Sequence, residues 1–256
     1  MHKIFSLFIA ALFIGTSAFA QLKTNKGQEI LPQKGDLAVG VYNDDDFTIT
    51  MKKVVEADKH KRYRLRLGYN STSEVFKVQD DIQTANNPNA SVLVDDKVTT
   101  SVTDIMFLYG IEKRKGNGRM QGFYGGEGGV GISNTTIKHD FANGFVSENV
   151  FAPSTSIPGQ DGIFPRTTEA NLGTGLNFEL KGIVGAEFFF LEKLSVGLEW
   201  AWGLELQTRG EGKVKTEEWD DVNSQKVSLT TNTGKLTSVT FGSDNIEQRV
   251  KLLFYF

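Results

Sequence analysis

Hydrophobic and polar residues alternate along much of the chain, with the period of two that is typical of β-strands. From Leu194 to Leu206 every second residue is Leu, Val or Trp, and the residues between are Ser, Gly, Glu and Ala. Similar alternation recurs down to the last residue. It predicts eight antiparallel strands, at about 36–42, 47–54, 62–70, 101–113, 120–133, 174–190, 194–207 and 245–256.

The connections between these stretches differ greatly in length. Short polar turns are expected at 56–61, 114–119 and 191–194, and long polar sections at about 71–100, 134–173 and 208–244. A compact domain rarely holds several loops of that size. A membrane barrel combines short periplasmic turns with long extracellular loops.

The third long section offers an alternative strand count. Its sequence "KVSLTTNTGKLTSVTF" alternates around Thr233-Gly234 and could form a further hairpin, which would give ten barrel strands. The faces of that hairpin carry Ser, Thr and Lys, and offer little surface for lipid. We therefore expect strands that extend above the membrane, and a barrel of about eight strands.

Alternation alone does not decide which face is outside, because a soluble barrel that binds an apolar ligand would show it too. Strand length favours a membrane barrel: fourteen residues, tilted by about 45°, rise roughly 33 Å. Aromatic residues such as Tyr63 and Tyr69 lie at strand ends, where membrane barrels have aromatic girdles.

The polar faces carry charges of both signs. An eight-stranded barrel is just wide enough to be filled by side chains, and charges buried there need partners. We expect these charged residues to form a polar network inside the barrel: Arg64, Arg66, Glu112, Glu127, Glu179, Lys181, Glu187, Glu199, Glu205, Glu247, Arg249 and Lys251.

The start of the chain differs from the rest. Residues 1–20 have a Lys, an apolar run and a small-residue ending, the pattern of a cleaved secretory signal peptide. Residues 21–35 show no periodicity and are expected to be a flexible periplasmic segment, followed by the barrel at 36–256. A formal net charge of −3 gives no general basic field for nucleic acid, and the absence of Cys excludes disulfides.

With its signal peptide, eight alternating strands and C-terminal "RVKLLFYF", the chain resembles small outer-membrane β-barrel proteins of Gram-negative bacteria. The opening "KGDLAVGVY" is similar to the first strand of such proteins in Bacteroidota. This resemblance covers residues 35–256. It implies an outer-membrane location, contact with outer-membrane lipid, and an insertion signal at Phe254, Tyr255 and Phe256 that the outer-membrane insertion machinery reads.

Candidate chemistry is sparse. His139, with Ser133 nearby and Asp140 adjacent, is the candidate base for a lipid-modifying enzyme, whereas His60 falls in an expected periplasmic turn. The sequence "GGEGGVG" is not followed by a helix, so close packing within a strand is expected there rather than nucleotide binding. Acidic pairs such as Asp95-Asp96 lack the ligand spacing of an EF-hand.

The sequence thus predicts a non-enzymatic barrel without cofactor or metal, whose long loops serve structural or interaction roles and bind any extracellular ligand. The alternatives are an outer-membrane lipid-modifying enzyme, a transport or secretion component, and a soluble periplasmic barrel for an apolar ligand.

Overall fold

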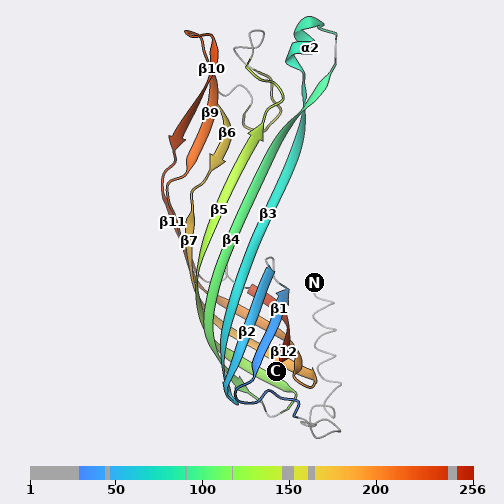
Figure 1. Cartoon of the computed structure of the whole chain (residues 1–256), viewed down its shortest axis with the longest axis vertical. Coiled ribbons are helices and arrows are strands. Elements are labelled where there is room, and N and C mark those ends of the chain that lie inside the picture. The colour runs from blue at the N-terminus through green and yellow to red at the C-terminus, as the bar shows by residue number, and fades with distance from the viewer. Residues whose placement is uncertain are drawn as a thin grey trace.

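The computed structural model describes residues 29–43, 47–89, 91–116, 118–145, 153–160, 165–241 and 247–256. Within these ranges the chain forms one sheet of twelve strands and a short helix (Figure 1). The expected signal peptide and residues 21–28 lie outside the described residues. In the described part of the chain, no helix is long and apolar enough to cross a membrane.

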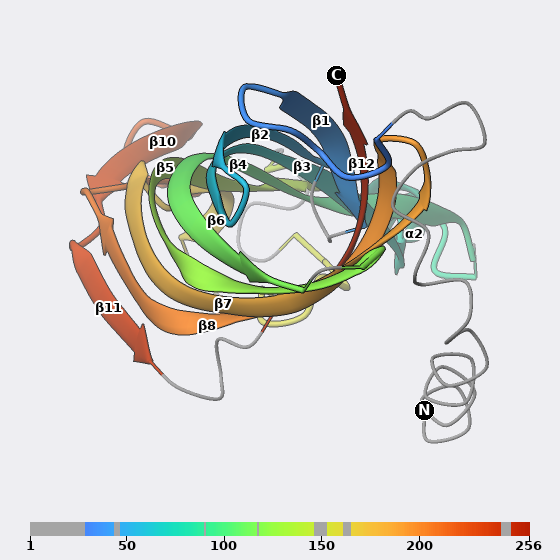
Figure 2. The ribbon, with the colours of Figure 1, turned by 90° about the horizontal axis from the view of Figure 1, so that it is seen from below.

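Eight of the strands close into a ring. In order around the ring they are β1 (Leu37–Asn43), β2 (Phe47–Glu56), β3 (Lys59–Gln79), β4 (Leu93–Lys115), β5 (Met120–Asp140), β7 (Gly175–Leu191), β8 (Leu194–Arg209) and β12 (Glu247–Tyr255). Each strand pairs antiparallel with the next, and β12 pairs with β1. The fold is therefore the predicted up-and-down β-barrel of eight strands, and Figure 2 shows the ring from below.

The register fixes how the strands are staggered. Paired residues followed once around the ring give the series Val196, Leu252, Val41, Ile49, Leu65, Phe107, Val130, Phe178 and Leu206. This series starts on β8 at position 196 and returns to β8 at position 206, ten residues further along. For eight strands about 4.8 Å apart, that stagger gives a strand tilt of about 40°, within the usual range for barrels.

The two faces of the barrel wall have opposite chemistry. Every residue of that series is apolar and faces outward, and outward residues such as Leu180 are largely exposed, by 64% in that case. The largest fully buried side chains instead include Arg62, Arg249 and Lys251. Soluble proteins bury apolar side chains and almost never bury Lys or Arg fully without partners, so this barrel is inverted relative to a soluble one.

The strands continue beyond the expected turns. Only two residues separate β2 from β3, and two separate β7 from β8. His60 and Arg114, which were expected in turns, lie instead in β3 and β4 with buried side chains. The prediction failed there because polar residues at inward positions look like turn residues in the sequence.

The long sections contain regular structure above the barrel, at the end opposite the short turns. β3 and β4 continue as a hairpin, with the helix α2 (Asp81–Asn86) near its tip. The other upper strands are β6 (Arg166–Asn171), β9 (Lys213–Asp220), β10 (Gln225–Asn232) and β11 (Leu236–Phe241). β6 joins the upper end of β5 to β9, which pairs with β10.

The hairpin considered around Thr233-Gly234 does not form. β10 pairs with β9, whereas β11 lies along β8, on the same edge that β12 occupies lower down. β12 pairs with the lower part of β8 and β11 with its upper part, so the two strands occupy the same place in the wall, one above the other. The expectation that this section adds strands above the barrel rather than two more barrel strands agrees with these pairings.

The lower end of the barrel is closed by apolar side chains. Ile30 is 1% exposed and packs in one cluster with Ala38, Val54, Phe189 and Leu253. The backbone carbonyl of Ile30 accepts a hydrogen bond of 3.1 Å from the amide of Lys193. The expectation of a flexible segment over 21–35 therefore needs correction for residues 29–35, since burial of Ile30 anchors them under the barrel.

Candidate functional site: the charged interior of the barrel

The lowest layer of the interior lies just above the apolar cluster. Lys52 Nζ contacts both carboxylate oxygens of Glu112, at 2.9 and 2.8 Å. Arg114 Nη2 donates to Glu112 at 2.8 Å and to Glu187 at 2.7 Å. The Tyr255 hydroxyl donates to Glu187 at 2.8 Å and accepts from Arg114 at 2.8 Å.

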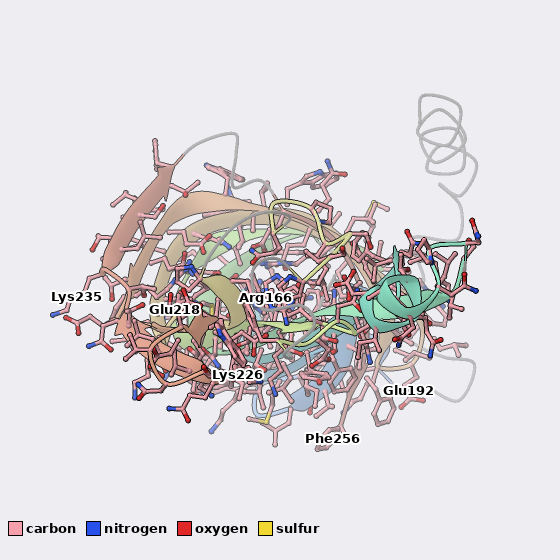
Figure 3. The ribbon with its side chains drawn as sticks, turned by 90° about the horizontal axis from the view of Figure 1, so that it is seen from above. Arg166, Glu192, Glu218, Lys226, Lys235 and Phe256 are labelled. Carbon is pink, nitrogen blue, oxygen red and sulfur yellow. The ribbon has the colours of Figure 1, made fainter. Side chains whose placement is uncertain are left out.

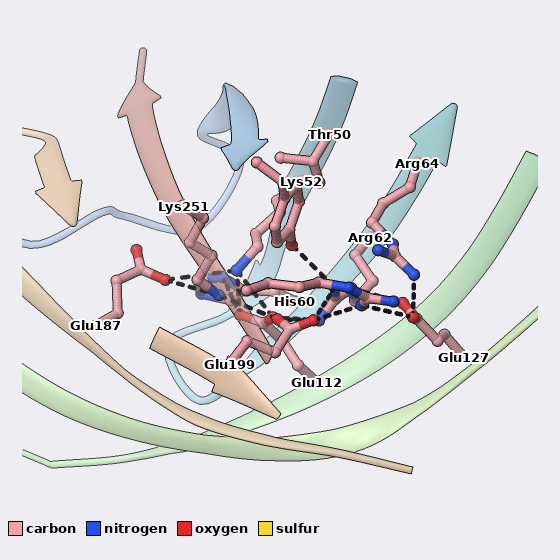
Figure 4. Close-up of polar contacts among 12 residues, drawn as sticks. Thr50, Lys52, His60, Arg62, Arg64, Glu112, Glu127, Glu187, Glu199 and Lys251 are labelled. Atoms are coloured by element: carbon pink, nitrogen blue, oxygen red, sulfur yellow. Dashed lines mark hydrogen bonds and ion pairs between the residues drawn. The ribbon is translucent and has the colours of Figure 1, made fainter. Parts of the chain in front are cut away.

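The middle layer is centred on Glu199, which is 1% exposed. Arg62 binds its two oxygens with two nitrogens, at 2.9 and 2.8 Å. Arg249 lies 3.0 Å and Lys251 3.4 Å from the same carboxylate. Arg62 also donates to the Tyr42 hydroxyl at 2.9 Å. Figure 4 shows how residues of the lower and middle layers converge on one another.

A second carboxylate completes the middle layer. Glu127 is 3.2 Å from Arg62 Nε and 3.2 Å from Arg249 Nη1, and it also pairs with Arg64. Bidentate and charge-assisted contacts of this kind are the strong ones. Ions that are removed from water need close contacts of good geometry and further hydrogen bonds to offset the loss of hydration.

The upper layer is partly open to solvent. Arg66 lies 3.0 Å from Glu179 and 3.4 Å from Asp104, and Lys181 Nζ donates to Glu179 at 2.8 Å. Glu247 pairs with Lys181 and with Arg249 of the layer below. The exposed fraction of these side chains rises to 23% at Glu247, so the network reaches water at its top.

Many of these contacts cross the lumen. The pair Arg62–Glu199 joins β3 to β8, and these strands are four positions apart in the ring of eight. The contact of Arg114 with Tyr255 joins β4 to β12, again on opposite walls. Side chains from facing walls therefore meet and fill the lumen.

Small residues on the inner face make this filling possible. A Cβ at Gly185 would lie 2.3 Å from the ring of Phe123, and one at Gly110 would lie 2.7 Å from Glu127 Cβ. Phe123 in turn lies under Lys251, whose Nζ is 3.7 Å from the ring centroid. The glycines thus leave space for large side chains in a narrow ring.

The structure places all twelve of the expected interior residues on the inner face of the wall. Eleven of them take part in the contacts above. Glu205 lies higher on β8 and is half-buried, and its side chain makes no hydrogen bond or ion pair with another described residue.

Sequence analysis did not assign to this network several residues that belong to it: Tyr42, Lys52, Arg62, Asp104, Arg114, Ser195 and Tyr255. Arg62 shares the parity of the assigned Arg64 and Arg66, and Lys52 lies on the polar face of its strand, so both gave an available signal. Arg114 shares the parity of Glu112, but it was read as part of the turn at 114–119.

No reactive group of an enzyme is assembled among the described residues inside the barrel. The layers contain cations, carboxylates and phenols that neutralise one another. In the described ranges no group of three or more His, Asp or Glu side chains is arranged to hold a metal ion. His60 is buried at the bottom, with Nδ1 3.6 Å from Glu112.

The residues of the possible lipid-modifying site are far apart. Ser133 and His139 lie six positions apart on the single strand β5, which corresponds to about 20 Å. Partial burial lowers the pKa of His139, against the opposing effect of Asp140, and its ring stacks on Phe141. Ser133 and His139 therefore cannot act as nucleophile and base on one substrate atom.

A second polar cluster lies above the barrel, in the segments that connect the upper strands. Arg166 of β6 is sandwiched between Phe141 and Phe145, with its guanidinium carbon 4.1 and 4.8 Å from the ring centroids. It donates to Glu217 at 2.8 Å and to the carbonyl of Asn143 at 2.7 Å. Figure 3 shows Arg166 near the centre of the molecule seen from above.

Asp96 of β4 fixes a neighbouring part of this cluster. It accepts hydrogen bonds from the amide of Ala142 at 2.8 Å and from the Thr155 hydroxyl at 2.6 Å. We call the set of Asp96, Asn143, Thr155, Arg166 and Glu217 the upper cluster. It ties segments 141–145 and 153–160 to the sheet, so part of the expected long loops has a defined shape.

The three C-terminal aromatic residues divide between the two faces. Phe254 and Phe256 point outward, are about half exposed, and stack with ring centroids 6.1 Å apart. Tyr255 points inward and is fully buried. Their expected role as an insertion signal stays a prediction.

Comparison with known proteins adds little. No family model matches the chain, and no curated protein matches it. Among solved structures, the chain is similar to a major outer membrane protein from Thermus thermophilus. The two share 10% identity and a TM-score of 0.33, over 86% of this chain and 97% of that one. A likeness at that TM-score carries no argument here.

Proposed function

We propose that this protein is an integral β-barrel of the bacterial outer membrane, that it is not an enzyme, and that it presents structured segments at the cell surface for structural or interaction roles. The observation that carries the proposal is the inversion of the wall. A closed ring with apolar residues outside and paired charges inside suits hydrocarbon around the barrel, because each of its eight strands is hydrogen-bonded to a neighbouring strand on both sides.

The direction of the barrel follows from its two ends. The lower end has two-residue turns, and the upper end has extended hairpins, α2 and the upper cluster. Membrane barrels place short turns in the periplasm and long segments outside. The upper strands would therefore face the exterior, and an extracellular ligand would bind there.

The transport alternative requires a continuous aqueous path. The three layers of cross-lumen contacts and the cluster around Ile30 leave little room for one. We therefore expect no steady conductance in planar bilayers. Stepwise conductance from the folded protein would overturn the assignment of a closed barrel.

Two measurements test the membrane proposal. The folded protein should require detergent for extraction from cell envelopes, and its gel mobility should change on boiling, since a closed barrel resists unfolding by detergent alone. Extraction by salt or carbonate would instead support a soluble periplasmic barrel. The resemblance to the Bacteroidota-type family stays a prediction.

A further inference from the structure

One sector of the lower rim carries an unusual concentration of lysine. The side chains of Lys53 on β2, Lys59 and Lys61 on β3, and Lys113 and Lys115 on β4 lie at outward-facing positions. We call these five residues, together with Lys34, the basic rim. Elsewhere on the lower rim, outward positions hold aromatic residues such as Phe190 and Phe256.

The lysines of the basic rim lack anionic partners in the described structure. None of the six makes an ion pair with a described residue, whereas the interior cations are all paired. Lys53 lies directly opposite Lys61, whereas Lys59 lies between Lys113 on β4 and Glu56 on β2. Like charges directly opposite one another across two strands destabilise a sheet, so the pair of Lys53 and Lys61 favours a counter-ion supplied from outside the chain.

A pocket of about 320 Å³ lies in this sector. It is lined by Lys34, Gly35, Lys53, Val54, Val55, Lys61 and Tyr63. Three lysines, a glycine, two valines and a tyrosine thus border one hollow. The lysines supply positive charge for a phosphate, and the valines and the tyrosine supply apolar surface for a hydrocarbon chain. A phospholipid carries both groups.

The level of the basic rim fits the same ligand. With a tilt of about 40°, each residue adds about 2.5 Å of height. The outward apolar run on β3, from Tyr63 to Tyr69, is then about 15 Å high, whereas the run on β7, from Leu176 to Phe190, is about 35 Å high. The usual apolar band is about 25 Å, so on the β3 side the lysines lie at the level where lipid headgroups begin.

We propose that the basic rim binds the phosphate of an anionic glycerophospholipid in the periplasmic leaflet. The ammonium groups of Lys34, Lys53 and Lys61 contact the phosphate, and Tyr63 contacts the upper part of an acyl chain. Long lysine side chains suit this role because the stem stays on apolar surface while the charged end reaches the headgroup. This inference rests on the proposed membrane location.

The test compares lipid retention by the full-length protein and two double variants. Each is equilibrated in micelles that contain equal amounts of phosphatidylglycerol and phosphatidylcholine, and the lipid that remains after washing is quantified. K53Q/K61Q removes charge from the rim. K97Q/K138Q is the matched control, since Lys97 and Lys138 are exposed, outward-facing lysines on the upper parts of β4 and β5.

The wild type and the control should retain phosphatidylglycerol preferentially, and K53Q/K61Q should lower that preference by about thirtyfold, at the usual contribution of a lysine near an anionic surface. Equal retention of both lipids by the wild type, or equal loss in both variants, would overturn the proposal. Displacement of the lipid by millimolar inorganic phosphate would also overturn it, since the pocket would then be a site for free phosphate.

A second readout separates this proposal from the membrane location itself. All three proteins should show heat-modifiable mobility. In phosphatidylcholine vesicles K53Q/K61Q should be at least as stable as the wild type, because its like-charge pair is gone. If the wild type is not heat-modifiable, the membrane assignment fails. If it is heat-modifiable but has no preference for the anionic lipid, only the basic rim proposal fails.

Discussion

Replacement of Glu199 by Gln tests whether the paired charges hold the barrel together. Glu199 is 1% exposed and contacts three cations: Arg62, Arg249 and Lys251. The substitution keeps the size of the side chain and removes its charge, which leaves these cations with an uncompensated excess of positive charge inside the wall. Loss of one partner of a buried ion pair costs about 3–5 kcal/mol, so we expect E199Q to lower the free energy of unfolding by that amount.

The same strand supplies a matched control. Glu205 also faces inward on β8, but it is half-buried and has no described ion-pair partner. We therefore expect E205Q to change the free energy of unfolding by less than about 1 kcal/mol. Both variants carry the same chemical change, six residues apart, so composition and net charge are held constant between them.

Urea unfolding from phosphatidylcholine vesicles, followed by tryptophan fluorescence, gives the free energies. Trp200 and Trp202 lie between the two substituted positions on β8 and report on this part of the strand. A double variant with Arg62→Met should lose less than the sum of the two single losses, since the two residues contact each other. Equal effects of E199Q and E205Q, or strict additivity with Arg62→Met, would refute the idea that cross-lumen ion pairs stabilise the barrel.

Two further substitutions and one deletion test other parts of the structure. Leu180→Arg, at a position that is 64% exposed, should destabilise the protein in vesicles by about 2–4 kcal/mol if that surface faces lipid, and urea titration would measure it; a soluble barrel would tolerate the change. Ile30→Ala should cost about 2–5 kcal/mol in the same titration through the cavity that it leaves under the barrel. Deletion of Phe256, which is 56% exposed, should reduce the amount of barrel assembled in cells, measured by heat-modifiable mobility in envelopes, with little change in the stability of refolded protein. Normal assembly would show that Phe256 is not part of an insertion signal.

Alternation in the sequence was sufficient to predict the ring because each strand must separate an apolar face from a polar one. Residues such as Leu198 and Glu199 differ so strongly that the period of two is visible without any tertiary information. The phase on β5 was harder to read, since outward Gly126 and Gly128 carry no side chain to mark a face. The pairing of β5 with β4 and β7 fixes that phase. This pairing joins residues that are far apart in the chain, so the local sequence does not reveal it.

The partners within the interior could not be predicted in the same way. Arg62 and Glu199 are 137 positions apart in the chain, and their contact depends on the stagger of ten residues around the ring. β6 and β9 were missed for another reason. Both have polar side chains on their two faces, so their pairing leaves no apolar stripe in the sequence.

The interior network and the upper cluster both hold an arginine through several partners, one inside the ring and the other above it. Inside the ring, Arg62 is held by Glu199 from the opposite wall and by Glu127 of β5, so its contacts join facing parts of the wall. Above the ring, Arg166 is held between Phe141 and Phe145 and by Glu217, which fixes connecting segments over the sheet. A guanidinium with several partners of fixed geometry restricts motion more than an apolar contact does. The wall therefore carries an upper surface of defined shape, and such a surface is what the proposed role at the cell surface requires.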